Sequence, residues 1–242
     1  MDCAKLYSSE IILQMTDLKI LFSHNHWARK ATHWRGENHP AYQHVLSYVW
    51  EKFRGELEAC ETILDVGCGN GNFILMAAGR CSDMRVVGID SCEALVRMGR
   101  IKGNDVAVAK ANALPFRNSS FDVVIGMSLL HHVSNVEEVV KEMRRVARQT
   151  VLISEPNLYS PLQWLSSLRP HEWSAFRCSP ARLIRVFRSE FQTVKVNYGG
   201  IVAENLTPSW LVPPLRVLEP FVDRYVAKPL ALGIYLAGHK DD

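Results

Sequence analysis

The sequence predicts an α/β fold in which a parallel sheet carries helices on both faces. Short apolar runs of strand length alternate with amphipathic stretches of helix length, and this alternation is typical of such a sheet. A glycine-rich loop at residues 67–71 directly follows the first apolar run of the series. The chain has 242 residues, of which 48% are hydrophobic, so one large domain with a substantial core accounts for its whole length.

The strands follow from apolar runs bounded by turn-forming residues. They are expected at residues 63–66, 85–89, 105–109, 121–125, 150–154, 191–198 and 230–237. The helices between them follow from apolar spacing and from N-terminal caps. Asn135 caps a helix with Glu137 in its first turn and with Arg144 and Arg148 near its end, which suits the helix dipole. Ser179 and Pro180 start another helix, and Ser91 can cap a third that runs to about residue 101.

Two further helices complete the expected architecture. A helix begins at about residue 72, directly after the glycine loop. Residues 41–58 place apolar side chains at helical spacing and predict a long helix that packs on the sheet. No internal repeat or low-complexity segment interrupts this pattern.

Composition narrows the functional classes. The net charge of +3 supplies no bulk electrostatic argument for a nucleic acid or a membrane partner. The six cysteines form no C-x-x-C pair and no zinc spacing, so we expect reduced thiols and no metal site. No run reaches the roughly 18 apolar residues of a membrane span, and the N-terminus lacks a secretory leader pattern. We therefore expect a cytoplasmic protein.

The loop itself indicates which ligand it holds. It is G-x-G-x-G, with Asn72 where a dinucleotide-binding loop has its third glycine, and no Lys-Ser/Thr pair of a Walker loop follows. Asp65 precedes the loop and would suit an ammonium group better than a pyrophosphate. Asp90 ends the next strand, 25 positions later, where an acid can accept both ribose hydroxyls. An adenosine ligand with a cationic amino-acid end fits both acids, and S-adenosylmethionine is such a ligand.

Four segments in order extend this interpretation: ILDVGCGNG, VVGID, ANALPFRNSSFDVVIGMSLLHHV and VLISEPN. Together they resemble the class I S-adenosylmethionine-dependent methyltransferases of the group called methyltransferase type 11. The resemblance covers about residues 60–155 well and the remainder in outline. It implies a Rossmann-like, seven-stranded and mostly parallel sheet with an antiparallel last strand. It also implies that S-adenosylmethionine is the cofactor and S-adenosylhomocysteine the product.

The resemblance also assigns candidate cofactor-binding residues. Asp65 and the loop would line the methionine end, and Asp90 would bind the ribose. Asn112 stands where the family usually has an acid for the adenine amino group, with the Ala113 amide beside it. Ser91 and Cys92 would flank the adenine, although Ser91 could equally be only a helix cap. The full set is Asp65, Gly67, Cys68, Gly69, Asp90, Ser91, Asn112, Ala113, Leu114 and Met127, with Leu130 approaching after the fourth strand.

A hydroxyl acceptor would also need a base. The candidates are His131 and His132 after the fourth strand, Glu155 after the fifth, and His171. A histidine here is often a structural hydrogen-bonding group, and Glu155 can simply satisfy loop amides. The segment EPNL, which begins at Glu155, superficially resembles the Asn-Pro-Pro-Tyr box of base-modifying amino-methyltransferases. That box belongs after the fourth strand, so we discount it.

Two segments are expected to select the acceptor. Residues 23–44 are rich in His, Trp and Arg and are interpreted as a lid closed by Trp27 and Trp34, with a nucleic-acid surface as the rival interpretation. Residues 200–229 are apolar, and Leu211, Leu215, Leu218, Val222 and Val226 lie near helical spacing. We expect a helix here whose apolar side chains cover the active-site mouth, although ordinary packing, a dimer contact or a membrane surface would explain it too.

The sequence as a whole predicts one methyltransferase domain. Its parts are an N-terminal lid at residues 1–58, a cofactor-binding core at residues 59–155, and a substrate-side half at residues 156–242. The favoured reaction is O-methylation of a small apolar acceptor, with nucleic acid disfavoured and with peripheral membrane contact and a homodimer as possible features. The alternatives are methylation of RNA or protein, and a non-catalytic cofactor-binding module.

Overall fold

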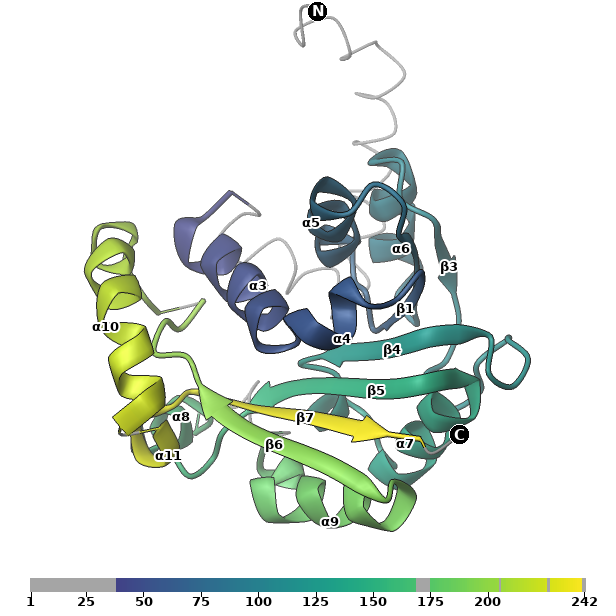
Figure 1. The fold of residues 1–242 in the computed structure, drawn as a ribbon. Helices are drawn as coiled ribbons and strands as arrows, with labels where there is room; N and C mark the ends of the chain where they lie inside the picture. Colours follow the sequence, from purple (N-terminus) through teal and green to yellow (C-terminus); the bar gives the residue numbers. More distant parts are fainter. Residues whose placement is uncertain (1–37, 169–174, 205, 226, 241–242) are drawn as a thin grey trace, which may run out of the picture.

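The computed structural model describes residues 38–168, 175–204, 206–225 and 227–240 (Figure 1). Its centre is a seven-stranded sheet in the order β3-β2-β1-β4-β5-β7-β6. The strands are β1 (Thr62–Val66), β2 (Arg85–Asp90), β3 (Val106–Val108), β4 (Phe121–Met127), β5 (Ala147–Pro156), β6 (Thr193–Gly199) and β7 (Gly233–His239). All neighbouring pairs are parallel except those of β7, which is antiparallel to both β5 and β6. The predicted α/β fold with an antiparallel last strand is confirmed.

One face of the sheet is covered by the helices α3 (Pro40–Lys52), α4 (Arg54–Glu58), α5 (Asn72–Arg80) and α6 (Glu93–Ile101). Trp50, Phe53 and Leu57 are almost fully buried there and pack with Ile63 of β1 and Phe73 of α5. Complete burial of large side chains of this kind contributes about 1.5–3 kcal/mol each. This apolar layer fixes the start of β1 and therefore the loop that follows it.

The opposite face is covered by α7 (Val136–Val146) and α9 (Pro180–Glu190), as Figure 1 shows. Asn135 caps α7, since its side chain accepts a hydrogen bond from the Glu138 amide. Ser179 caps α9 in the same way, through the Arg182 amide. The buried residues of both helices follow the apolar spacing in the sequence. Both caps therefore begin helices where the sequence predicts them.

The C-terminal part adds helices beyond the carboxyl edge of the sheet. These are α8 (Pro161–Ser166), the 3-10 turn η4 (Ser209–Leu211), α10 (Val212–Tyr225) and α11 (Ala227–Leu230). In Figure 1, α10 lies beside α3 at the periphery of the molecule. Among the helices of the described ranges, none combines the length and hydropathy that a membrane span requires. Within the same ranges, no group of three His, Cys, Asp or Glu side chains could hold a metal ion.

Several predicted element boundaries differ from the structure. The helix expected at residues 41–58 is divided at Phe53, which ends α3 and precedes α4. Arg148 was expected near the end of a helix but lies in β5. There its guanidinium group forms an ion pair with Asp122. Ser91 does not cap α6, because Cys92 occupies the N-cap position. The last strand begins at Gly233, since residues 227–230 form α11.

The insertion at residues 200–229 contains the expected helix, but several of its apolar side chains face the solvent. Val212 is buried against Ala41 and Val202, whereas Val217, Leu218 and Phe221 are all more than half exposed. The inward face of α10 instead carries Glu219, which is only 4% exposed. The physical reason is that α3 offers polar partners to this face, so Glu219 is buried beside Val212 and Leu215, which pack in an apolar cluster with Ala41.

Candidate functional site

The glycine loop between β1 and α5 is held close to the end of β2. The amides of Gly67 and Cys68 both donate hydrogen bonds to the carbonyl oxygen of Ile89, at 2.8 and 3.0 Å. Gly67 has a φ of 77°, a left-handed conformation that glycine adopts without strain. A Cβ atom at this position would lie 2.8 Å from Leu129 Cδ1. Glycine therefore lets the loop approach the segment that follows β4.

Asp90, the last residue of β2, fixes the loop from the other side. Its Oδ2 accepts a hydrogen bond from the Gly69 amide at 2.9 Å, and its Oδ1 accepts one from the Cys92 amide at 2.7 Å. Burial raises the pKa of the Asp90 carboxyl, although the backbone donors oppose that shift. Each carboxylate oxygen has further lone-pair capacity. The two oxygens are thus oriented so that they could accept the two hydroxyls of a ribose.

Asp65 lies beneath the loop and is 1% exposed. Among the residues that the structure describes, neither of its oxygens has a hydrogen-bond partner. Burial, followed by the nearby charge of Asp90, raises the pKa of Asp65 to about 8. A buried carboxylate without a donor is costly, and a cationic group next to it would remove that cost. The ammonium group of S-adenosylmethionine fits this requirement.

A cavity of about 280 Å³ opens beside these acids. Four of the predicted cofactor residues line it: Gly67, Asp90, Ser91 and Asn112. Cys92 also lines it, as expected for a residue next to the adenine. The amide nitrogen of Asn112 lies 3.4 Å from a Glu138 carboxylate oxygen, so its carbonyl oxygen is the atom that could accept the adenine amino group.

The other predicted cofactor residues lie outside the cavity lining. The Ala113 amide donates to the Lys110 carbonyl oxygen in a turn, at 3.1 Å. Leu114 is buried in the apolar core and its amide donates to Glu142. The remaining predicted residues that do not line the cavity are Asp65, Cys68, Gly69, Met127 and Leu130. Asp65 and Gly69 still act on the site, through charge and through the hydrogen bond to Asp90.

Much of the cavity wall has no specific signal in the sequence. Residues 109–111 after β3 and residues 133–135 before α7 contribute to it, as do Leu95 and Leu129. These segments lie beyond the carboxyl ends of parallel strands of the same sheet, which is where ligands bind in open α/β sheets. Strand order was therefore the signal that could have located them.

Ser128 is a further residue that the sequence did not indicate. It follows β4 with a φ of 48°, in the left-handed region that non-glycine residues seldom adopt. Its amide donates to the Ser154 carbonyl oxygen at 2.8 Å, which holds the turn against the end of β5. Such a conformation costs on the order of 1–3 kcal/mol and is often found at functional sites. Ser128 lines both the first cavity and a second one next to it.

His131 and Glu155 form a buried pair between the ends of β4 and β5. Glu155 Oε1 accepts hydrogen bonds from the amides of Leu129 and Leu130, and Oε2 lies 2.6 Å from His131 Nδ1. In a neutral imidazole, Nδ1 then carries the proton toward Glu155, and Nε2 is the basic nitrogen. Both oxygens of Glu155 are engaged, so this geometry suits a positioning residue better than a base.

His132 takes a different position from its neighbour. It lines both cavities, whereas His131 lines only the second. The two imidazole rings lie with their centroids 3.8 Å apart. Of the predicted catalytic side chains, His132 is therefore the one placed at the junction of the two cavities. The predicted lid residues Trp27 and Trp34 and the candidate base His171 fall outside the described residues.

The second cavity measures about 160 Å³ and is lined by both polar and apolar side chains. His44, Tyr48, Glu219 and Tyr235 contribute to it together with the histidine pair. Burial, followed by the charges of Glu219 and Asp223, holds the pKa of Tyr235 far above its usual value. Tyr235 thus remains protonated near neutral pH. The cavity therefore offers hydrogen-bonding groups beside apolar surface.

Comparison with known proteins agrees with this geometry. Residues 64–153 match the family model of a methyltransferase domain. A probable tRNA methyltransferase 9B of Bos taurus is 30% identical over 115 residues, which are 46% of this chain and 24% of the relative. A tRNA (carboxymethyluridine(34)-5-O)-methyltransferase of Arabidopsis thaliana is 32% identical over 105 residues, 41% of this chain and 25% of the relative. The chain spans about a quarter of the length of these two relatives.

A solved structure shows the same fold. It is a SAM-dependent methyltransferase from Archaeoglobus fulgidus, which superposes with a TM-score of 0.61 at 15% identity. The match covers 89% of this chain and all of that chain.

One prediction has to be corrected. A small apolar acceptor was favoured and nucleic acid was disfavoured, yet the curated relatives are named as tRNA methyltransferases. The error arose because the apolar residues of 200–229 were assigned to the acceptor pocket. In the structure several of them face outward, and the pocket has both polar and apolar walls.

The ordered motifs, the sheet with its antiparallel last strand, the orphan carboxylate of Asp65 and the family match all agree on one assignment. The chain contains a methyltransferase domain of the class I S-adenosylmethionine-dependent type, which the family model matches over residues 64–153, and its cofactor is S-adenosylmethionine.

Proposed function

We propose that this protein transfers the methyl group of S-adenosylmethionine to an oxygen atom of a modified base in tRNA. The observation that carries the proposal is the similarity to relatives named as tRNA methyltransferases, one of which is named for 5-O-methylation of carboxymethyluridine 34. A carboxymethyl group presents a carboxylate oxygen. This choice keeps oxygen as the acceptor atom and replaces the small molecule by an RNA base.

The arrangement of the two cavities supports methyl transfer between separate ligands. The first cavity contains Asp90 and the loop residue Gly67, which would hold the cofactor. The second contains His44 and Tyr235, which can hydrogen-bond an acceptor. Ser128 and His132 line both cavities, so the methyl group would cross near them. A sulfonium methyl group is already activated, and alignment of donor and acceptor supplies most of the catalysis.

A carboxylate acceptor also gives the histidines a role that needs no proton abstraction. Such an oxygen is already deprotonated near neutral pH and can attack the methyl carbon directly. His132 would then bind and orient the acceptor. Glu155 would act as a positioning residue through His131 and through the amides of Leu129 and Leu130. Asp65 would hold the ammonium end of the cofactor, and Asp90 would hold its ribose.

The test uses methyl-labelled S-adenosylmethionine and two short stem-loop RNAs. They differ in a single loop base, which is 5-carboxymethyluridine in one and uridine in the other. We expect label in the carboxymethylated RNA only, and we expect mild alkali to release it as methanol because the product is a methyl ester. The matched control is the Asp90→Ala variant, which should fail to label either RNA because it lacks the ribose ligand.

Two outcomes would contradict the proposal. Alkali-stable label would mean that the acceptor is nitrogen, carbon or a ribose hydroxyl, and the oxygen assignment would be wrong. Wild-type protein that binds S-adenosylhomocysteine but labels neither these stem-loops nor unfractionated tRNA would exclude RNA as the acceptor.

A further inference from the structure

We propose that the outward face of α10, together with η4 and α11, is a docking surface for the unpaired part of the RNA acceptor. This inference rests on the proposed function, because it takes RNA as the substrate. It identifies a second surface that binds the RNA, outside the acceptor cavity. The surface is defined by Trp210, Arg216, Phe221, Arg224, Tyr225 and Lys228, and is called the α10 surface below.

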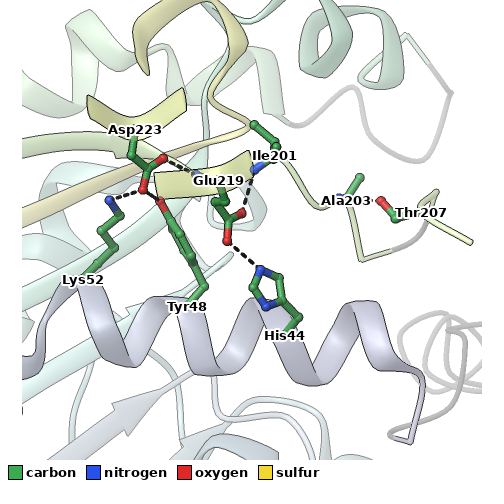
Figure 2. A network of polar contacts seen from close by, with 9 residues as sticks. His44, Tyr48, Lys52, Ile201, Ala203, Thr207, Glu219 and Asp223 are labelled. Carbon is green, nitrogen blue, oxygen red and sulfur yellow. Dashed lines mark hydrogen bonds and ion pairs between the residues drawn. The ribbon is translucent and has the colours of Figure 1, made fainter. Parts of the chain in front are cut away.

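The orientation of α10 is set by two carboxylates on its inner side (Figure 2). Glu219 Oε2 lies 2.7 Å from His44 Nε2, and Glu219 Oε1 accepts a hydrogen bond from the Ile201 amide at 3.0 Å. Asp223, one helical turn later, accepts hydrogen bonds from the Tyr48 hydroxyl and from Lys52 Nζ. These contacts form the α3–α10 clamp, which fixes the side of α10 that faces the solvent.

The clamp places the negative charges of α10 on its inner side and leaves the positive charges on its outer side. Glu219 and Asp223 are the only acidic residues between positions 205 and 240 of the sequence, and both belong to the clamp. The basic residues Arg216, Arg224 and Lys228 are exposed. A face that carries cations and no acids favours a polyanion, and phosphate groups are the anions that RNA supplies.

Aromatic side chains lie among these cations. Trp210 is 74% exposed, Tyr225 is 64% exposed and Phe221 is 58% exposed. The rings of Phe221 and Tyr225 have centroids 4.9 Å apart, and the Arg224 guanidinium lies 5.5 Å from the Tyr225 ring centroid. Solvent exposure of three large aromatic rings is costly unless they serve contacts. Exposed rings beside Arg and Lys form the stacking platform that unpaired bases use.

The position of the α10 surface relative to the acceptor cavity supports the same substrate. Glu219 lines the second cavity from the inner side of α10. The α10 surface is therefore about one helix diameter, roughly 10 Å, from the cavity. In Figure 1, α10 lies at the periphery, with α3 on its inner side. An RNA loop could place one base in the cavity while neighbouring nucleotides contact the α10 surface.

The experiment measures binding of the carboxymethylated stem-loop RNA and methyl transfer to it with the same protein preparations. One variant is R216E/R224E, and the second is W210A/F221A. The matched charge control is R185E/R188E on α9, which carries two exposed arginines on the other face of the sheet. Leu75→Ala is the apolar control, since Leu75 is exposed on α5.

We expect R216E/R224E to weaken RNA binding at least about tenfold and to lower the dependence of binding on salt, because phosphate contacts are lost. W210A/F221A should weaken binding by about 5- to 100-fold with little change in salt dependence, because base stacking is lost. Both controls should stay within about twofold of wild type. Affinity for S-adenosylhomocysteine should be unchanged in all four variants, which confirms that each is folded.

Each contrary outcome has one interpretation. Wild-type protein that methylates the RNA, with both α10 variants binding it as tightly as wild type, would overturn the docking surface and leave the proposed function intact. An α10 surface that serves a second copy of the chain would be revealed by a wild-type dimer in sedimentation that both variants convert to a monomer without loss of RNA binding. Failure of the wild type to bind or methylate RNA would overturn the proposed function and this inference with it.

Discussion

The two sides of the carboxyl edge of the sheet are held together by different forces. The cofactor side depends on buried apolar contacts: Ile63, Leu64 and Val66 of β1 are completely buried, and the glycine loop follows directly from them. The acceptor side depends on the α3–α10 clamp, in which Glu219 and Asp223 bind polar groups far away in the sequence. Apolar packing fixes the position of a backbone through many weak contacts. The clamp fixes the position of α10 through a few strong hydrogen bonds and ion pairs.

This difference has a consequence for function. The cofactor is the same throughout the family, and a rigid apolar framework suits a constant ligand. The wall of the second cavity contains His44 and Glu219, so the clamp that orients α10 also forms part of the proposed acceptor site. A few substitutions could change this wall without disturbing the sheet. The comparison therefore predicts that damage to either side should remain confined to that side.

The largest effect is expected on the cofactor side, from Asp65→Asn. The substitution removes the charge that would pair with the cofactor ammonium group inside the protein, and such losses correspond to at least about 2–5 kcal/mol. We therefore expect affinity for S-adenosylmethionine to fall about 100-fold or more by titration calorimetry. Asp83→Asn, on the exposed turn before β2, is the control and should bind normally.

The raised pKa of Asp65 also predicts that protons are released when the cofactor binds. With a pKa of about 8, Asp65 is mostly protonated in the free protein at pH 7, and an ammonium partner lowers that pKa. Binding should then release about one proton at pH 7, measured as a heat that depends on the ionisation enthalpy of the buffer. Release that persists in Asp65→Asn would assign the proton to another group.

The stability of the free protein should also depend on the protonation of the Asp65 carboxyl group. Its folded-state pKa is raised, so the native state binds more protons than the unfolded state between about pH 4 and pH 8. The free energy of unfolding should therefore fall as pH rises through that range, and Asp65→Asn should reduce this fall. Bound S-adenosylmethionine should reduce it too.

The contrast between the two sides also explains which residues of the site could be predicted from the sequence. Gly67, Asp90 and Asn112 line the cavity, and each lies in a local motif at or shortly after the end of a strand. Ala113 does not line it, and its amide is used in a turn with Lys110, which the motif does not specify. Ser128 was missed because its importance depends on a left-handed φ and on the two cavities that meet beside it.

The acceptor side offered weaker signals. His44 and Glu219 are 175 positions apart, and no periodicity in the sequence relates them. The apolar spacing of α10 was visible, but apolar spacing alone does not show which face is buried when a neighbouring helix presents His44, Tyr48 and Lys52. The two acids at positions 219 and 223, one helical turn apart, were the available clue. They indicated the buried face only once their partners on α3 were known.

An intermediate effect is expected where the two sides meet, at the histidine pair. His132→Ala should lower methyl transfer by about 10- to 100-fold with little change in thermal stability, since His132 is only half-buried at the junction. His131→Ala should instead lower the free energy of unfolding by about 3–5 kcal/mol, because it leaves the buried Glu155 without its partner.

Turnover and chemical denaturation measured on the two variants check this contrast. His239, which lies outside both cavities, provides a control in His239→Ala. If both histidine variants lose stability and activity together, the assignment of separate roles is wrong.

The smallest effect is expected from weakening the clamp with Glu219→Gln. The amide keeps an oxygen that can accept from the Ile201 amide but weakens the bond with His44, so α10 should remain helical and shift locally. We expect KM for RNA to rise by about three- to tenfold, while kcat and affinity for S-adenosylhomocysteine stay close to wild type. Asp223→Asn should act in the same direction, because it weakens the bonds from Tyr48 and Lys52.

The matched control is Glu190→Gln, which neutralises an acid at the end of α9 on the other face of the sheet. A clamp variant that loses affinity for S-adenosylhomocysteine as strongly as for RNA would show that the clamp supports the whole carboxyl edge. The two sides would then form one cooperative unit, and α10 would have to be regarded as part of the cofactor site. Selective loss of RNA affinity would instead mean that the acceptor wall can change while the cofactor framework stays constant.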